Sequence, residues 1–156
     1  MKDDSRKDRY MLRDRLGKEL LYFDGGMGTL LQERGLAPGE LPETWNVEHP
    51  EVIREIHRRY IEAGSDIVLT NTFGANALKF HDERRSLKEI VEEAVGHVKE
   101  AVREAGAGRE IYTALDVGPT GKLLKPMGDL DFETAYEAFR EVMVMGEQAG
   151  ADLIHI

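Results

Sequence analysis

The 156-residue sequence contains no cysteine, so its own residues can form neither a disulfide nor a thiolate metal site. It has no apolar run long enough to cross a membrane, and its N-terminus lacks the apolar core of a signal peptide. Basic residues are in the minority, because 21 lysines and arginines stand against 30 aspartates and glutamates, which gives a formal net charge of −9. We therefore expect a cytoplasmic protein with no nucleic-acid partner, since phosphate binding favours a basic surface, and with no membrane partner.

The sequence does contain a regular alternation of short apolar runs and longer amphipathic segments. Apolar runs of strand length occupy residues 20–23, 67–70, 111–115 and 151–156. Apolar residues at helical spacing and turn residues at the boundaries predict helices over 28–34, 50–63, 75–80, 86–105 and 132–149. Strands that alternate with helices in this order predict right-handed βαβ units and a parallel sheet, hence an α/β fold.

The first 19 residues differ in character from the rest of the chain. Residues 1–19 are rich in charge and predict a lead-in with a short helix over about residues 4–16. Residues 20–156 carry the alternating pattern and are expected to form one domain.

Three of the apolar runs are followed by a polar side chain, namely Asp24, Asn71 and Asp116. The carboxyl ends of parallel strands meet at one edge of a sheet, so these residues are expected to face one site. Asp24 is followed at once by Gly25 and Gly26, which let backbone N–H groups approach a ligand closely. A carboxylate beside free amides suits a zwitterion, with the amine on Asp24 and the carboxylate on the amides. The alternative is a glycine turn in which Asp24 caps the next helix.

Two α/β folds are compatible with this pattern. A doubly wound, flavodoxin-like binding domain suits the length of 156 residues. The other is the N-terminal half of a (β/α)8 TIM barrel, with about four βα units, because a whole barrel typically needs about 250 residues. Residues 24–29 do not fit a dinucleotide-binding glycine loop, since Leu31 stands where its last glycine belongs. Polar residues at several strand ends favour the half barrel.

Four motifs in order, LLYFDGGMGT, HRRYIEAGSDIVLTNTFGAN, DVGPTG and AGADLIHI, resemble the homocysteine S-methyltransferase family. Within it, the chain is most similar to the N-terminal homocysteine-binding domain of cobalamin-dependent methionine synthases. The resemblance runs from residue 20 to residue 156 and implies a (β/α)8 barrel. The chain is then expected to be the first half of that domain, truncated at its fourth strand.

The resemblance implies methyl transfer to the sulfur of homocysteine, as in methionine synthesis. By position in the family motifs, Asp24, Gly25 and Gly26 are expected to hold the amino-acid end of homocysteine. Thr70 and Asn71, after the second strand, and Asp116, after the third, are expected to line the same mouth. Asn71 is expected to bond either the substrate or the neighbouring loops.

The absence of cysteine is the main departure from the family, which binds the homocysteine sulfur to zinc held by three cysteines from the later half of the barrel. Zinc and cobalamin or folate are therefore expected in a parent enzyme, and none in this chain alone, which is expected to be inactive by itself. The methyl donor stays open between methylcobalamin, betaine and S-methylmethionine. The five histidines (His49, His57, His81, His97 and His155) are interpreted as surface or packing residues rather than metal ligands.

A non-catalytic alternative also follows from the half barrel. Four strands leave two open edges, and exposed edges favour association. The chain is then expected to form a homodimer or to pair with the missing half of the barrel.

Overall fold

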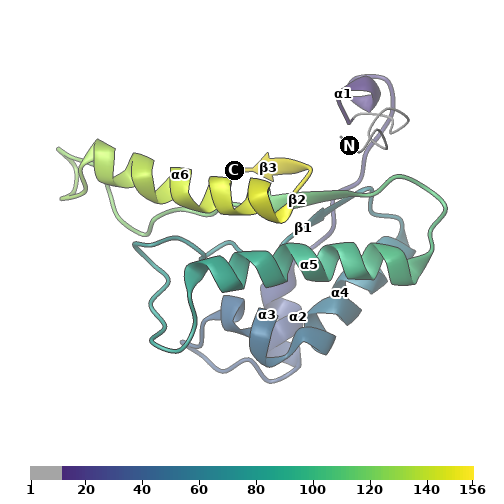
Figure 1. Cartoon of the computed structure of the whole chain (residues 1–156), viewed down its shortest axis with the longest axis horizontal. Coiled ribbons are helices and arrows are strands. Elements are labelled where there is room, and N and C mark those ends of the chain that lie inside the picture. Colours follow the sequence, from purple (N-terminus) through teal and green to yellow (C-terminus); the bar gives the residue numbers. More distant parts are fainter. Residues whose placement is uncertain (1–11) are drawn as a thin grey trace, which may run out of the picture.

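The structure is a computed structural model that describes residues 12–156. Its centre is a three-stranded parallel sheet in the order β1 (Ile67–Leu69), β2 (Tyr112–Asp116) and β3 (Leu153–His155) (Figure 1). In the register of the sheet, Val68 lies opposite Thr113 and Asp116 lies opposite His155. The predicted α/β fold with a parallel sheet is confirmed.

The predicted strand at 20–23 is reduced to a single parallel bridge between Phe23 and Ile67. The Tyr22 carbonyl accepts from the backbone N–H groups of Asp66 and Ile67, and the Asp24 N–H donates to the Ile67 carbonyl at 3.0 Å. Pairing stops there, because the Tyr22 N–H donates to the Asp66 carboxylate instead of a neighbouring strand. The segment nevertheless lies beside β1 and brings Asp24 to the carboxyl end of the sheet.

Three long helices lie where the sequence predicts them: α4 (Pro50–Ala63), α5 (Leu87–Ala105) and α6 (Phe132–Ala149). Shorter elements are α1 (Leu12–Arg15), α2 (Met27–Glu33), the 3-10 turn η2 (Pro42–Thr44) and α3 (Trp45–Glu48). Of the predicted lead-in helix, residues 4–11 lie outside the described residues.

The helix predicted over 75–80 is wrong. This segment forms turns, because the Asn76 side chain accepts from the Leu78 N–H at 3.1 Å and competes with a helical ladder. The α5 prediction succeeds for a visible reason: the Ser86 hydroxyl accepts from the Glu89 N–H at the first turn. The helix ends at Gly106, whose positive φ of 53° suits glycine.

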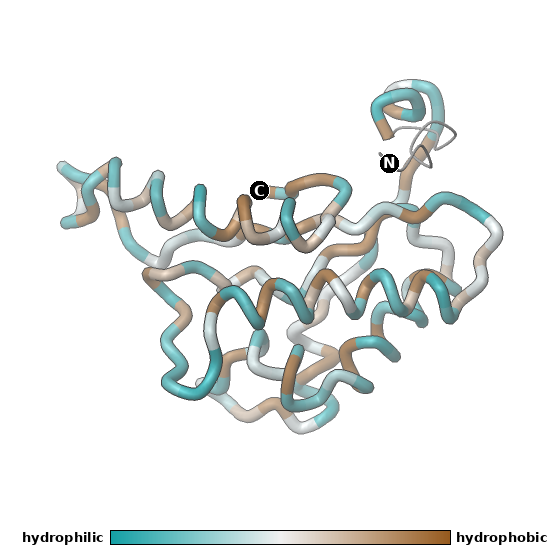
Figure 2. Tube along the Cα trace, in the orientation of Figure 1, coloured by the Kyte–Doolittle hydropathy of each residue, from teal (hydrophilic) through white to brown (hydrophobic). Residues whose placement is uncertain are grey.

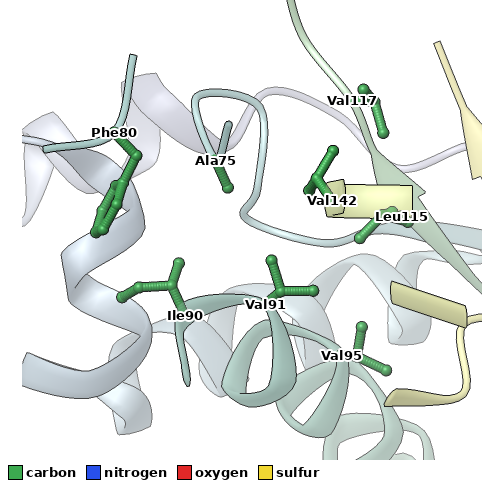
Figure 3. Packing of buried hydrophobic residues seen from close by; sticks show 8 residues of the cluster. All are labelled: Ala75, Phe80, Ile90, Val91, Val95, Leu115, Val117 and Val142. Atoms are coloured by element: carbon green, nitrogen blue, oxygen red, sulfur yellow. The ribbon is translucent and has the colours of Figure 1, made fainter. Parts of the chain in front are cut away.

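The helices bury one face of the sheet. Val68 and Leu115 point toward them and are fully buried, together with Val98 of α5 and Val142 of α6. Figure 3 shows this packing around Leu115, with Val91 and Val95 of α5 among the neighbours. Along α4 and α5 the colour in Figure 2 changes repeatedly between hydrophobic and hydrophilic. The buried residues recur every three to four positions, as Ile53, Ile56 and His57 of α4 do, which is the pattern of an amphipathic helix.

The opposite face of the sheet is less covered. Ile67, Tyr112 and Ala114 are buried there, with Leu12 and Leu21 of the N-terminal segment packed against them. Within residues 12–156, no strand pairs with the outer edge of β3. No helix of that part of the chain is both long enough and apolar enough to span a bilayer.

Candidate functional site

A cleft of about 710 Å³ opens at the carboxyl ends of the strands. All six residues predicted to bind substrate line it: Asp24, Gly25, Gly26, Thr70, Asn71 and Asp116. The opposite wall comes from residues 39–43, and Phe73 and Lys79 also line the cleft. The structure therefore brings the predicted residues to one place, as parallel strands require.

Asp24 has one satisfied and one unsatisfied carboxylate oxygen. Its Oδ2 accepts from the Leu69 N–H at 3.1 Å, whereas Oδ1 is buried and has no hydrogen-bond partner among the described residues. The pKa of Asp24 is raised from 3.8 to about 7, mainly by burial. The charge of Asp116 contributes to the rise, while backbone N–H groups and His155 oppose it. A buried oxygen without a partner in a cleft is suited to a cationic or hydrogen-bond-donating ligand.

Gly25 and Gly26 are held against Tyr60 of α4. A Cβ on Gly25 would lie 2.8 Å from the Tyr60 Oη, so no other residue fits there without displacement. The Tyr60 hydroxyl donates to the Gly26 carbonyl at 3.1 Å. No side chain caps α2, whose N-cap is Gly26, so the alternative interpretation of Asp24 as a helix cap is wrong.

Thr70 connects the ends of β1 and β2. Its hydroxyl accepts from the Asp116 N–H at 3.1 Å and lies 2.6 Å from the Thr72 hydroxyl, which donates to the Asp116 carbonyl at 2.7 Å. Thr70 and Thr72 are both buried. Their hydroxyls therefore hold the Asp116 backbone in position.

Asn71 bonds the neighbouring loops, which is one of the two roles predicted for it. Its Nδ2 donates to the Pro42 carbonyl at 2.7 Å and to the Asn46 Oδ1 at 3.1 Å. Asn46 returns a bond to the Asn71 carbonyl at 2.9 Å, and its own carbonyl lies 2.6 Å from Nε2 of the buried His97. This buried network ties the end of β1 to the loop that forms the opposite wall of the cleft.

Sequence reasoning missed Glu43, whose carboxylate is buried beside the cleft and accepts from the Gly74 N–H. A Cβ on Gly74 would lie 2.6 Å from the Glu43 Oε1, so a side chain at position 74 would require that carboxylate to move. The sequence offers one weak signal, a glutamate between Pro42 and Trp45, and this does not distinguish a buried carboxylate from a loop residue.

Sequence reasoning also missed the pairing of Asp116 with His155. The His155 Nδ1 lies 3.1 Å from the Asp116 Oδ1, and the His155 ring packs 5.3 Å from that of Phe23. The two residues are direct neighbours across β2 and β3, so parallel pairing brings them together. By contrast, His57 is a packing residue as predicted: it is fully buried, and desolvation lowers its pKa to about 3.

The residues of this chain do not fit the zinc that the family resemblance implies. Cysteine is absent from the sequence, and residues 12–156 hold no group of three or more histidine, aspartate or glutamate side chains able to bind a metal ion. No chemical step is therefore assigned to a metal here.

Comparison with known proteins agrees with these features. A family model described as homocysteine S-methyltransferase matches residues 21–156. Methionine synthase from Mycobacterium tuberculosis is 31% identical over 152 residues, which cover 92% of this chain and 13% of that protein. The Mycobacterium leprae methionine synthase is 29% identical, over 92% of this chain and 12% of that protein.

Solved structures of a homocysteine methyltransferase also match this chain. Crystal structures of the homocysteine methyltransferase MmuM from Escherichia coli match with a TM-score of 0.76 for the oxidized form and 0.75 for the metallated form. Their sequences are 28% and 27% identical to this one, and the match covers 92% of this chain and 55% of theirs. The chain thus spans about half of MmuM and a small part of the methionine synthases. The chain belongs to the homocysteine S-methyltransferase family.

Proposed function

We propose that the cleft binds homocysteine for methyl transfer to its sulfur, the reaction that forms methionine. The observation that carries this proposal is the buried, unpartnered Oδ1 of Asp24 in a cleft of a homocysteine S-methyltransferase family member. The substrate ammonium takes that oxygen, and the substrate carboxylate takes the backbone amides at Gly25 and Gly26. A bound ammonium favours the ionised carboxylate and offsets the cost of its burial.

The other predicted residues have supporting roles in this proposal. Thr70 and Asn71 shape the cleft rather than bind the substrate, because their side chains are hydrogen-bonded within the protein. Thr70 bonds Asp116, and Asn71 bonds Pro42 and Asn46. Asp116 places a second carboxylate in the cleft. The acidic lining favours an amine over an anionic ligand.

We further propose that this chain alone binds homocysteine without methylating it. Its residues supply no zinc site, and zinc together with cobalamin or folate belongs to the parent enzyme in this proposal. The chain covers 13% of the M. tuberculosis methionine synthase, which leaves most of that protein without a counterpart here. In this proposal, the parts of such a parent enzyme that have no counterpart in this chain hold the methyl donor.

Isothermal titration calorimetry of the full chain with L-homocysteine tests the binding. We expect Asp24→Asn to weaken binding about 10- to 100-fold, since losing a charged hydrogen bond costs about 1.5–3 kcal/mol. The matched control is Asp129→Asn, which removes the same charge from an exposed loop outside the cleft and is expected to leave the affinity unchanged. Equal affinities for Asp24→Asn and wild type would reject the role of Asp24.

A second surface supports the proposal that the sheet is part of a (β/α)8 barrel. A groove of about 770 Å³ runs between α6 and β3, lined among others by Phe132, Tyr136, Met143, Leu153 and Ile154. It lies beside the outer edge of β3, and the MmuM chains extend well beyond the matched part. We propose that further βα units of the barrel pack on this groove. Light scattering that finds a stable dimer would instead assign the groove to a second copy of the chain.

A further inference from the structure

Asp116 contributes a carboxylate to the cleft, but its contact with His155 has no role in the binding proposal. Asp116 holds the Nδ1 of His155 at 3.1 Å, and no described residue bonds its Nε2. The imidazole is 44% exposed, so a ligand can reach that nitrogen. A carboxylate that fixes one ring nitrogen and leaves the other accessible is the arrangement of a general base and its orienting partner.

The pair also lies close to the proposed amine-binding group. The His155 ring packs against Phe23, the residue that immediately precedes Asp24, and Asp116 lines the same cleft as Asp24. The charges of Asp116 and His155 both act on Asp24, in opposite directions. In homocysteine only three carbons separate the amine from the thiol, a span of about 5 Å from ordinary bond lengths. A molecule anchored on Asp24 can therefore direct its sulfur toward the ends of β2 and β3.

We propose that His155, oriented by Asp116, accepts the thiol proton of homocysteine bound in the cleft. This inference rests on the proposed function and adds a proton acceptor to it. The S–H bond breaks, its electron pair stays on sulfur, and the proton forms a new bond to the Nε2 of His155. The Asp116 carboxylate stabilises the resulting imidazolium. The product is a thiolate, the form of a thiol that acts as a nucleophile.

The pKa of a free thiol shows why a proton acceptor would matter. A free cysteine-like thiol has a pKa of about 8.5, so only a few per cent is thiolate at neutral pH. An imidazolium beside a thiol lowers the thiol pKa, by one to several units in known Cys–His sites. The carboxylates of Asp24 and Asp116 line the same cleft, and negative charge there opposes the lowering of the thiol pKa. We therefore expect a shift at the lower end of that range.

The test is an ultraviolet pH titration of the thiolate absorbance of homocysteine bound to the full chain. For wild type, we expect the thiol to titrate about one pH unit below free homocysteine. His155→Gln is expected to abolish the shift and to change the affinity for homocysteine, measured at a pH where the thiol is protonated, less than about threefold. Asp116→Asn is expected to reduce the shift. His81→Gln changes an exposed histidine outside the cleft and is the matched control.

The outcomes separate the two proposals. If His155→Gln binds homocysteine through Asp24 and its bound thiol titrates as in wild type, the role of His155 is wrong and the binding proposal stands. If wild type does not bind homocysteine, both proposals fail. Nitrogen-detected NMR of free His155 adds a readout that does not depend on ligand: the Nδ1–H tautomer is expected, and the Nε2–H tautomer would overturn the proposed geometry. Circular dichroism verifies folding, and His155→Asn replaces the glutamine variant if that one does not fold.

Discussion

The two faces of the sheet differ in what they contribute. On the helix-covered face, Val68 and Leu115 are fully buried beneath the long helices. On the other face, Phe23 remains 45% exposed and the side chain of His155 44% exposed. The cleft with its carboxylates lies at the strand ends. The comparison indicates that one face supplies most of the stability, while the strand ends and the open face supply the chemistry of the site.

Two buried titratable groups sharpen this difference. Burial lowers the pKa of His57 and raises the pKa of Asp24, and both changes favour the uncharged form of the side chain. His57 lies in the packed helix layer, whereas Asp24 borders a cleft where a ligand can replace the lost water. The desolvation of His57 is therefore permanent in the folded chain, whereas a ligand bound in the cleft can compensate for the desolvation of Asp24.

The largest expected effect is on the helix-covered face. Leu115→Ala removes a fully buried side chain of the cluster shown in Figure 3, and we expect it to lower the free energy of unfolding by about 2–5 kcal/mol. Phe23→Ala, on the open face, is the comparison variant and is expected to cost about 1 kcal/mol or less. Urea unfolding followed by circular dichroism measures both. Equal losses would show that the two faces contribute alike.

The second effect concerns acid sensitivity in the helix layer. The pKa of His57 is about 3 in the folded chain and 6.5 in the unfolded chain, so between these values mainly the unfolded state takes up the proton. Stability is therefore lost as the pH falls from 6.5 toward 3. We expect His57→Leu to remove about 2–3 kcal/mol of this loss. If unfolding curves of the variant and wild type keep a constant offset across pH 4–7, this assignment is incorrect.

The third and smallest effect arises in the cleft, where Asp24 gives stability a pH dependence opposite to that of His57. The pKa of Asp24 is about 7 in the folded chain and 3.8 in the unfolded chain, so between these values the folded state holds the extra proton. Stability is therefore lost as the pH rises from 4 through 7. Asp24→Asn is expected to remove about 1–2 kcal/mol of this loss, a value reduced for the partial exposure of the group. A variant whose stability follows wild type from pH 4 to 8 would contradict the shift.

The sequence predicted the long helices well, because α4, α5 and α6 each carry an apolar stripe and clear end signals. It overestimated the strand at 20–23, because the competition of the Asp66 carboxylate for the Tyr22 N–H arises only when distant segments meet. The helix expected at 75–80 failed for a local reason, the turn-forming side chain of Asn76.

Some residues of the site could be predicted from sequence, and others could not. A polar residue directly after a buried strand is visible in sequence, and this rule placed Asp24, Asn71 and Asp116 at the cleft. Glu43 and His155 were missed because their partners, Gly74 and Asp116, are distant in the chain. Such pairs depend on loop packing and strand register.

The central claim, that homocysteine binds at the strand ends, is tested most directly by an NMR titration of the 15N-labelled chain with L-homocysteine. The account predicts that the amide signals of residues 24–28, 70–71 and 116 shift in a saturable way. Signals from the groove between α6 and β3 are expected to remain unchanged. Saturable shifts confined to that groove, or no shifts at millimolar homocysteine, would contradict the account.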